Sequence, residues 1–150
     1  MSERLAVQGL DPLPNHIPNY EVPTAGDRYP LAMISPPARN FLNSTFVNVE
    51  SLRAIEKEPL VEISLMDAAA RGISTGDTVK VFNDRGEYHC KADVSARARP
   101  GVVNGLGIWW RKMGLNGTNV NEVTSQLLTD LGRAPVFYDC QVEVALLKKA

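Results

Sequence analysis

The stretch VKVFNDRGEYHCKADVS, residues 79–95, has the alternating pattern of a β-hairpin. In its second half apolar and polar side chains alternate: Tyr88, Cys90, Ala92 and Val94 against Glu87, His89, Lys91 and Asp93. This period of two places one face of a strand in the core and the other in water. The letters NDRG between the two halves supply a turn, because Gly86 can adopt a positive φ. The stretch therefore predicts two antiparallel strands and a β-rich fold.

Short apolar or alternating runs predict the remaining strands, including the first strand of this hairpin. They are YPLAMIS (29–35), LVEIS (60–64), STGDTVKVF (74–82), VVNGLGI (102–108) and VFYDCQVEVALL (136–147). Pro100 and Gly101 form a turn before the fourth of these runs. About six or seven short strands with a few short helices indicate a mainly β chain, folded as a small barrel or sandwich with helical crossings.

A first helix is expected over residues 47–57. Val49, Leu52 and Ile55 fall on one helical face, which predicts that this face packs on the core. Pro59 follows closely and ends the helix.

Two further helices are expected, over residues 64–72 and 121–132. In the first, Ser64 stands three positions before Asp67, as in a capping box, and a glycine closes the segment. In the second, Asn121 is the expected N-cap. The apolar stripe of that second helix consists of Val123, Leu127, Leu128 and Leu131, with Gly132 at its close.

Composition and charge are those of one ordinary globular domain and disfavour several classes of protein. The 150 residues carry 16 Lys and Arg against 17 Asp and Glu, a net charge of −1. A protein that neutralises nucleic-acid phosphates is usually much more basic, so no nucleic-acid partner is expected. No apolar run approaches the roughly 20 residues that span a bilayer. The first residues, MSERLAVQGLDPLP, lack the features of a secretory signal.

Cysteine usage agrees with a cytoplasmic chain. Cys90 and Cys140 stand far apart with no CxxC pair, which favours two reduced thiols. We therefore expect the cytoplasm; the periplasm stays open, because an export signal would lie outside this chain.

The prolines divide the chain into two parts. Seven of the ten precede Ala38: Pro12, Pro14, Pro18, Pro23, Pro30, Pro36 and Pro37. Since repeated prolines block both helices and central strands, residues 1–28 are expected to be an extended arm or linker from a preceding domain. Residues 29–150 are expected to be the folded β domain.

Catalytic machinery is scarce in the sequence. There are two histidines, His16 in the arm and His89 in the hairpin. His89 and Cys90 are neighbours in a strand, so they point to opposite faces and cannot form a dyad. The sequence has no spacing of Cys and His typical of a metal site, no GxSxG elbow and no GxxxxGK[ST] phosphate loop. We infer that the chain performs no chemistry alone.

Polar, amide-rich loops are the most informative feature. SPPARNFLNSTF (35–46) and GIWWRKMGLNGTNVNEVTS (107–125) offer Asn, Ser and Thr groups that can read the edges of a heterocycle. Arg39 and Arg111 can meet a phosphate or pyrophosphate. The adjacent tryptophans 109 and 110 can flank a flat ring or can equally be core and rim. The residues alone favour plain loop packing, with a large polar heterocyclic ligand as the alternative.

Five segments in order resemble one known family. They are YPLAMISPPARNFLNSTF (29–46), LVEISLMDAAARGISTGDTVKVFNDRGEYHCKADVSARARPGVV (60–103), GIWW (107–110), NVNEVTS (119–125) and FYDCQVEV (137–144). This order is similar to the C-terminal molybdopterin-dinucleotide-binding domain of the dimethyl-sulfoxide-reductase superfamily, which includes formate dehydrogenases and nitrate reductases. The resemblance implies a double-psi β-barrel, the barrel also found in an aspartate decarboxylase.

The same resemblance implies a cofactor. The domain would cover a bis(molybdopterin guanine dinucleotide), whose dithiolenes, and not this chain, hold molybdenum or tungsten. The implied partners are the remaining catalytic domains of the oxidoreductase, in cis or as a separate subunit. Metal-ligating Ser, Cys or selenocysteine residues lie in those other domains, so the substrate cannot be read from this chain.

Carried over position by position, the resemblance implies a set of cofactor-binding residues. The first loop supplies Ser35, Pro36, Arg39, Asn40, Phe41, Asn43, Ser44 and Thr45. Later segments supply Trp109, Asn119, Asn121, Thr124 and Tyr138. Many family members carry histidines in the first loop where this sequence has Asn40 and Asn43, so the donor pattern differs there.

Two other functions of this barrel type are the alternatives. A self-processing decarboxylase needs a Gly-Ser step, and the sequence has none. A substrate-recruiting module of hexameric ATPases would act through protein interaction and would not need the asparagine-rich loops.

Overall fold

The structure, a computed structural model, describes residues 3–11, 13, 15–22 and 26–150. Pro12, Pro14 and Pro23, on which the expectation of an extended arm partly rests, lie outside the described residues. Among its described residues the arm contains a short helix, α1 (Glu3–Val7), which precedes the first proline and was not expected.

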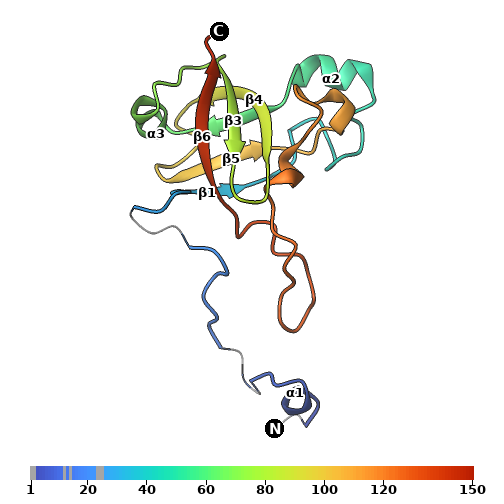
Figure 1. Ribbon diagram of the computed structural model, residues 1–150. Coiled ribbons are helices and arrows are strands. Elements are labelled where there is room, and N and C mark those ends of the chain that lie inside the picture. The colour runs from blue at the N-terminus through green and yellow to red at the C-terminus, as the bar shows by residue number, and fades with distance from the viewer. Residues whose placement is uncertain (1–2, 12, 14, 23–25) are drawn as a thin grey trace.

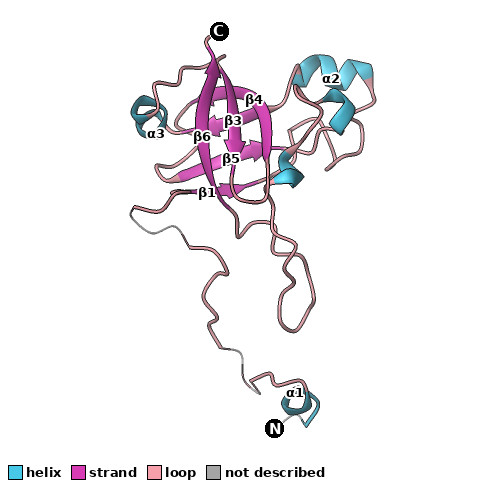
Figure 2. Ribbon diagram, in the orientation of Figure 1, coloured by secondary structure: helices cyan, strands magenta, loops and turns pink. Residues whose placement is uncertain are grey.

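Six strands close into a barrel in the order β1-β5-β2-β4-β3-β6 (Figures 1 and 2). Their bounds are β1 Leu31–Ile34, β2 Leu60–Ile63, β3 Thr78–Phe82, β4 Glu87–Val94, β5 Val102–Leu106 and β6 Gln141–Lys148. The prediction of a mainly β chain with short helices is confirmed. The strand expected over 136–147 begins later, at Gln141.

Strand pairing mixes two parallel pairs with four antiparallel ones. β1 runs parallel to β5 and β2 runs parallel to β4, whereas the other neighbours are antiparallel. The predicted hairpin is β3–β4, in which Val79 faces Cys90 and Val81 faces Tyr88. Parallel neighbours cannot be joined by a tight turn, so the segments that link them cross the ends of the barrel and form its loops.

The barrel interior is filled by apolar side chains, many of them valines. Met33, Val61, Val79, Val103 and Val142 are fully buried there. Burying each such side chain contributes roughly 1.5–3 kcal/mol to the free energy of unfolding. Interior and exterior residues alternate along β3 and β4, as the hairpin pattern predicts.

Helix α3 (Leu65–Ala70) has the predicted cap. The Ser64 hydroxyl accepts a hydrogen bond from the Asp67 backbone N–H at 3.1 Å and donates one to the Asp67 carboxylate at 2.6 Å. The same carboxylate accepts the Gly101 N–H at 2.8 Å, so the cap also ties α3 to the turn before β5.

Helix α2 (Glu50–Glu56) forms where predicted, but its buried face is narrower than expected. Leu52 packs against a second, smaller core. Ile55 is 62% exposed and Val49, at the N-cap, is 37% exposed. A helix of about two turns beside a small cluster covers one apolar position and leaves the others in water.

The prediction of a helix over residues 121–132 is wrong. All of these residues are described, and only a 3₁₀ turn, η2 (Val120–Glu122), precedes a β-like loop. In that loop Leu128 bridges Pro135, and the Thr129 N–H donates to the Ala134 carbonyl at 2.8 Å. Of the expected stripe only Val123 is buried in the core, whereas Leu127, Leu128 and Leu131 are about half exposed or more. Asn121 is therefore not a helix N-cap.

Candidate functional site

The first loop, residues 35–46, lies beside the segment that follows β5. The Gly107 N–H donates to the Pro36 carbonyl at 3.0 Å, and the Ala38 N–H donates to the Gly107 carbonyl at 2.7 Å. Further along, the Ile108 N–H donates to the Asn43 carbonyl at 3.3 Å. The two bonds at Gly107 continue the parallel pairing of β1 and β5 past the ends of both strands, and the third ties the first loop to Ile108. Two loops that are about 70 positions apart in the sequence thus form one surface.

The two tryptophans differ in their surroundings. Trp109 is 4% exposed and its ring meets Phe41 edge-on in the second core, which also contains Ala38 and Val47. Trp110 is half-buried, and its indole N–H donates to the Ser44 carbonyl at 2.7 Å. Of the two sequence interpretations, core and rim is the one the structure supports. Phe41 and Trp109 brace the first loop from beneath.

Asn119 connects the same surface to η2. Its side-chain amide donates to the Trp109 carbonyl at 2.8 Å, and its side-chain oxygen accepts the Asn121 N–H at 3.0 Å. Both ends of this amide are engaged by the chain. Asn119 therefore joins residues 107–110 to the 3₁₀ turn that carries Asn121.

Several predicted site residues present side chains that have no partner among the described residues. They are Arg39, Asn43, Ser44, Thr45 and Asn121, all exposed. Asn43 adopts a positive φ of 52°, a conformation that asparagine tolerates better than most residues. The structure thus offers one cation and four uncharged polar groups on the two adjacent loops.

Other predicted residues are already engaged. Both the backbone N–H and the side-chain amide of Asn40 donate to one carboxylate oxygen of Glu56, each at 2.7 Å. The Thr124 hydroxyl donates to the Asn121 carbonyl at 3.2 Å. Pro36 uses its carbonyl for Gly107, as described above, while Ser35 is half-buried at the start of the loop.

Tyr138 lies in a different segment. It is half exposed and packs edge-on against Phe137, with ring centroids 4.5 Å apart. Within the described residues no hydrogen bond or ring contact joins it to the first loop. Residues 126–138 form the long loop that projects from the barrel toward the arm in Figure 1.

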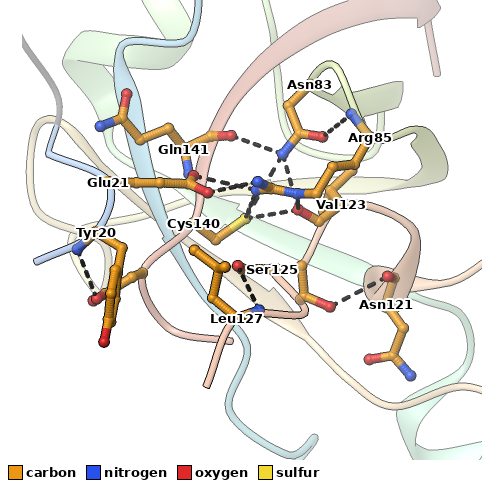
Figure 3. A network of polar contacts seen from close by, with 12 residues as sticks. Tyr20, Glu21, Asn83, Arg85, Asn121, Val123, Ser125, Leu127, Cys140 and Gln141 are labelled. Carbon is orange, nitrogen blue, oxygen red and sulfur yellow. Dashed lines mark hydrogen bonds and ion pairs between the residues drawn. The ribbon is translucent and has the colours of Figure 1, made fainter. Parts of the chain in front are cut away.

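Asn83 and Arg85, two residues of the β3–β4 turn, support the segment that carries Asn121, and the sequence did not single them out. The side-chain amide of Asn83 and the Arg85 Nε both donate to the Val123 carbonyl at 2.8 Å (Figure 3). The letters NDRG indicate only a turn. Because the acceptor lies about 40 positions away, no local pattern could have revealed this role.

Burial governs the chemistry of both thiols. The Cys90 side chain is fully buried, and burial raises its pKa well above the usual range. Burial likewise raises the pKa of Cys140 to about 11, against the opposing effect of nearby Arg85. Both thiols are therefore protonated near neutral pH, and the Cys140 S–H can donate to the Val123 carbonyl, 3.1 Å away.

The hairpin histidine has an ordinary surface environment. His89 Nε2 lies 3.1 Å from the Glu87 carboxylate on the outer face of β4, opposite to the buried Cys90. In the part of the chain that the structure describes, no group of three or more His, Cys, Asp or Glu could hold a metal ion. The described helices include none long and apolar enough to cross a membrane.

Comparison with known proteins assigns the family. Residues 31–141 match the family model described as "Molydopterin dinucleotide binding domain". The chain belongs to this family. Its associated cofactor is molybdopterin guanine dinucleotide, which agrees with the resemblance seen in the sequence.

Two curated relatives are large oxidoreductases. The chain is 34% identical over 143 residues to "Probable oxidoreductase YoaE" of Bacillus subtilis, which covers 95% of this chain and 20% of that protein. It is 36% identical over 130 residues to the dimethyl sulfoxide reductase DmsA of Escherichia coli, covering 83% of this chain and 16% of that protein. The chain thus spans about a fifth or less of the length of these relatives.

A solved structure shows the same fold. Acetylene hydratase from Pelobacter acetylenicus superposes with a TM-score of 0.82 at 16% sequence identity, over 96% of this chain and 22% of that one. Together with the closed six-stranded barrel, this likeness confirms the expected double-psi β-barrel.

Proposed function

We propose that this chain forms one wall of the bis(molybdopterin guanine dinucleotide) site of a molybdenum or tungsten oxidoreductase. The observation that carries the proposal is the pairing of the first loop with residues 107–125. These loops meet at one end of the barrel and present polar side chains there that have no partner within the described part of the chain. Family membership supplies the class of ligand.

The exposed groups fit the chemistry of such a cofactor. The side-chain amides of Asn43 and Asn121 can each donate and accept, as the edges of guanine and pterin require, and the Ser44 and Thr45 hydroxyls can do the same. Desolvating these uncharged groups costs less than desolvating charges. The Arg39 guanidinium can meet a pyrophosphate through two N–H groups.

The residues of this chain would bind the cofactor, orient it and shield it from solvent. When bound, the cofactor supplies the metal and its redox chemistry. The engaged residues, such as Asn40 and Asn119, hold the loop backbones in place, so that the unpaired side chains need little reordering to meet a ligand.

The rest of the enzyme is part of this proposal. Because the matched relatives are roughly five times longer than the matched region, we infer that further catalytic domains accompany this one, in cis or as a separate subunit. Those domains would set the substrate. Neither the family match nor the two relatives favours the alternative of a protein-interaction module.

A backbone-amide NMR titration of the chain tests the proposal. The probes are GDP and then a reduced pterin guanine dinucleotide. Shifts confined to residues 35–45 and 107–125 are the expected result. Asn121→Ala should weaken the response at unchanged fold, whereas Asn15→Ala, in the arm, should not. Shifts scattered over the barrel, or an equal response in Asn121→Ala, would contradict the assignment.

A further inference from the structure

One backbone carbonyl next to the proposed site receives three donors. The Val123 carbonyl accepts from the Asn83 amide and Arg85 Nε, both at 2.8 Å, and from the Cys140 thiol at 3.1 Å (Figure 3). The Val123 side chain is fully buried in the barrel core. This carbonyl is thus fixed from several directions, directly between Asn121 and Thr124.

The arm orients the arginine of this group. Glu21 meets Arg85 through two contacts, at 2.5 Å and 3.2 Å, in a fork-to-fork arrangement. One Glu21 oxygen also accepts the Gln141 N–H at 2.9 Å. Both side chains are about two-thirds buried or more, so this pair is less screened by water than an ordinary surface ion pair.

The β3–β4 turn forms a close platform behind η2. A Cβ at Gly86 would lie 3.0 Å from the Glu122 carbonyl, so the turn and η2 are in near contact. Asn83 braces the turn as well, because its side-chain oxygen accepts the Arg85 N–H at 2.9 Å. Its amide also donates to the Gln141 carbonyl at 2.9 Å.

The amide of Asn121 stands at the far side of this arrangement. Figure 3 shows its side chain directed away from the polar network, while its backbone belongs to the turn that the network holds. Any shift of the Val123 carbonyl would therefore move the Asn121 side chain relative to the first loop.

We propose that Arg85 and Glu21 are positioning residues for the segment that carries Asn121 and Thr124, and that they couple the arm to this segment. Arg85 holds the Val123 carbonyl, and Glu21 holds Arg85 in the orientation that this requires. When residues 20–22 contact the barrel, Asn121 and Thr124 are positioned for the ligand. When the arm dissociates, Arg85 loses its carboxylate partner Glu21, and the segment that carries Asn121 becomes more mobile. This inference rests on the proposed function for the identity of the ligand.

The arm has further contacts that keep Glu21 in place. The Tyr20 N–H donates to the Asp139 carboxylate at 3.2 Å, and its hydroxyl donates to the Leu128 carbonyl at 3.3 Å. Asp139 immediately precedes Cys140 in the chain. Residues 20 and 21 thus contact the long loop 126–138 itself, the segment that follows it and the hairpin turn.

Conservative variants separate positioning from bulk stability. Arg85→Lys keeps a cation opposite Glu21, but a lysine ammonium cannot hold the carboxylate in a fork and the Val123 carbonyl in the same geometry. Glu21→Gln keeps the size of the side chain and removes its charge. Arg28→Ala is a matched control, because Arg28 also pairs across to the hairpin turn, at Asp84, but both partners are about three-quarters exposed.

Amide hydrogen exchange of the full chain is the first readout. The N–H groups of Asn121, Glu122 and Val123 all donate within the Asn119–Val123 turn, so their exchange reports its order. We expect Arg85→Lys and Glu21→Gln to raise their exchange rates by about tenfold, the effect of losing one charged hydrogen bond. The rates in β2 and β5 and in Arg28→Ala should stay at the wild-type values.

GDP affinity, measured by NMR titration, is the second readout. The two variants should bind GDP several-fold more weakly, and Arg28→Ala should match the wild type. Unchanged exchange at residues 121–123 would overturn the inference, as would faster exchange with unchanged GDP affinity. If the wild-type chain shows no response to GDP or to the pterin dinucleotide, the proposed function is wrong. In that case Arg85 and Glu21 have no role in ligand binding, whatever the exchange rates.

Discussion

The Phe41 ring stands edge-on to the Trp109 indole, with ring centroids 5.2 Å apart and an interplanar angle of 78°. Phe41 comes from the first loop and Trp109 from the segment after β5. This contact is the apolar base of the proposed cofactor surface, because the polar side chains of both loops lie around it.

Removing the indole should therefore destabilise the chain and loosen the first loop. We expect Trp109→Ala to lower the free energy of unfolding by about 3–5 kcal/mol, the usual cost of truncating a buried aromatic side chain. Trp110→Phe is the comparison, since it keeps an aromatic ring at this half-buried position and removes the hydrogen bond to Ser44, worth about 0.5–1.5 kcal/mol. Urea unfolding measures both. Equal losses in the two variants would show that Trp109 is not the anchor.

The carboxylate of Glu56, at the end of α2, is expected to stabilise the first loop. One Glu56 oxygen receives two hydrogen bonds from Asn40, one from the backbone and one from the side chain. We expect Glu56→Ala to cost about 1–3 kcal/mol, as for hydrogen bonds to a charged group. Urea unfolding and the amide shifts of residues 38–45 report the change.

Glu50 provides the control for that experiment. It is exposed in the first turn of the same helix, and it makes no hydrogen bond or ion pair with the described residues. Glu50→Ala should cost less than about 1 kcal/mol, through the helix dipole alone, and should leave the first-loop shifts in place. A first loop that shifts equally in both variants would rule out a specific role for Glu56.

The strands and the helices α2 and α3 could be predicted because their signals are local. The alternation in β4 reports directly on burial, and the Ser64–Asp67 cap is complete within four residues. The failed helix at 121–132 shows the limit of that reasoning. Its leucine spacing is compatible with a helix, but Thr129 and Ala134 pair across a loop instead, and no core lies beneath it.

The candidate site could be predicted only in part from the sequence, for a similar reason. Which loops face the ligand could be proposed from the resemblance, but which asparagines are free could not. The side chain of Asn40 is engaged by Glu56 and that of Asn119 by Trp109, whereas the side chain of Asn43 has no partner among the described residues. These differences depend on neighbours that only the closed barrel brings together.

Low pH should lower the free energy of unfolding through Asp77. This residue is buried at the end of the barrel beside the C-terminal residues. Its carboxylate accepts from Lys149 Nζ at 2.9 Å, from the Ser74 N–H at 2.8 Å and from the Ala150 N–H at 2.9 Å. The Lys149 contact first, and then the backbone donors, hold the pKa of Asp77 below its usual value.

A depressed folded pKa fixes the sign of the effect. The stabilisation is fully present above the unfolded pKa of about 3.9 and is lost as the pH falls through the lower folded value. We expect the free energy of unfolding to drop as the pH falls below about 4, and this drop to be smaller in Asp77→Asn. Lys149→Ala should also reduce the drop, whereas Lys148→Ala should not. Parallel pH profiles for Asp77→Asn and the wild type would refute the assignment.

Gly114 should be essential to the shape of the loop that carries Asn119 and Asn121. Its φ is −74°, which any residue can adopt, but a Cβ there would lie 2.1 Å from the Thr118 carbonyl oxygen. Because backbone occupies that space, Gly114→Ala must displace the loop, at a cost of about 1–3 kcal/mol or more.

Gly132 gives the matched comparison, because a Cβ there meets nothing nearer than the Thr129 hydroxyl at 3.7 Å, an ordinary contact. Gly132→Ala should leave the free energy of unfolding within about 1 kcal/mol of the wild type. Only Gly114→Ala should also shift the amide signals of residues 116–121 and weaken the response to GDP. If Gly114→Ala kept both the stability and those signals, the loop would be able to rearrange without loss, and the close approach to Thr118 would not define the site.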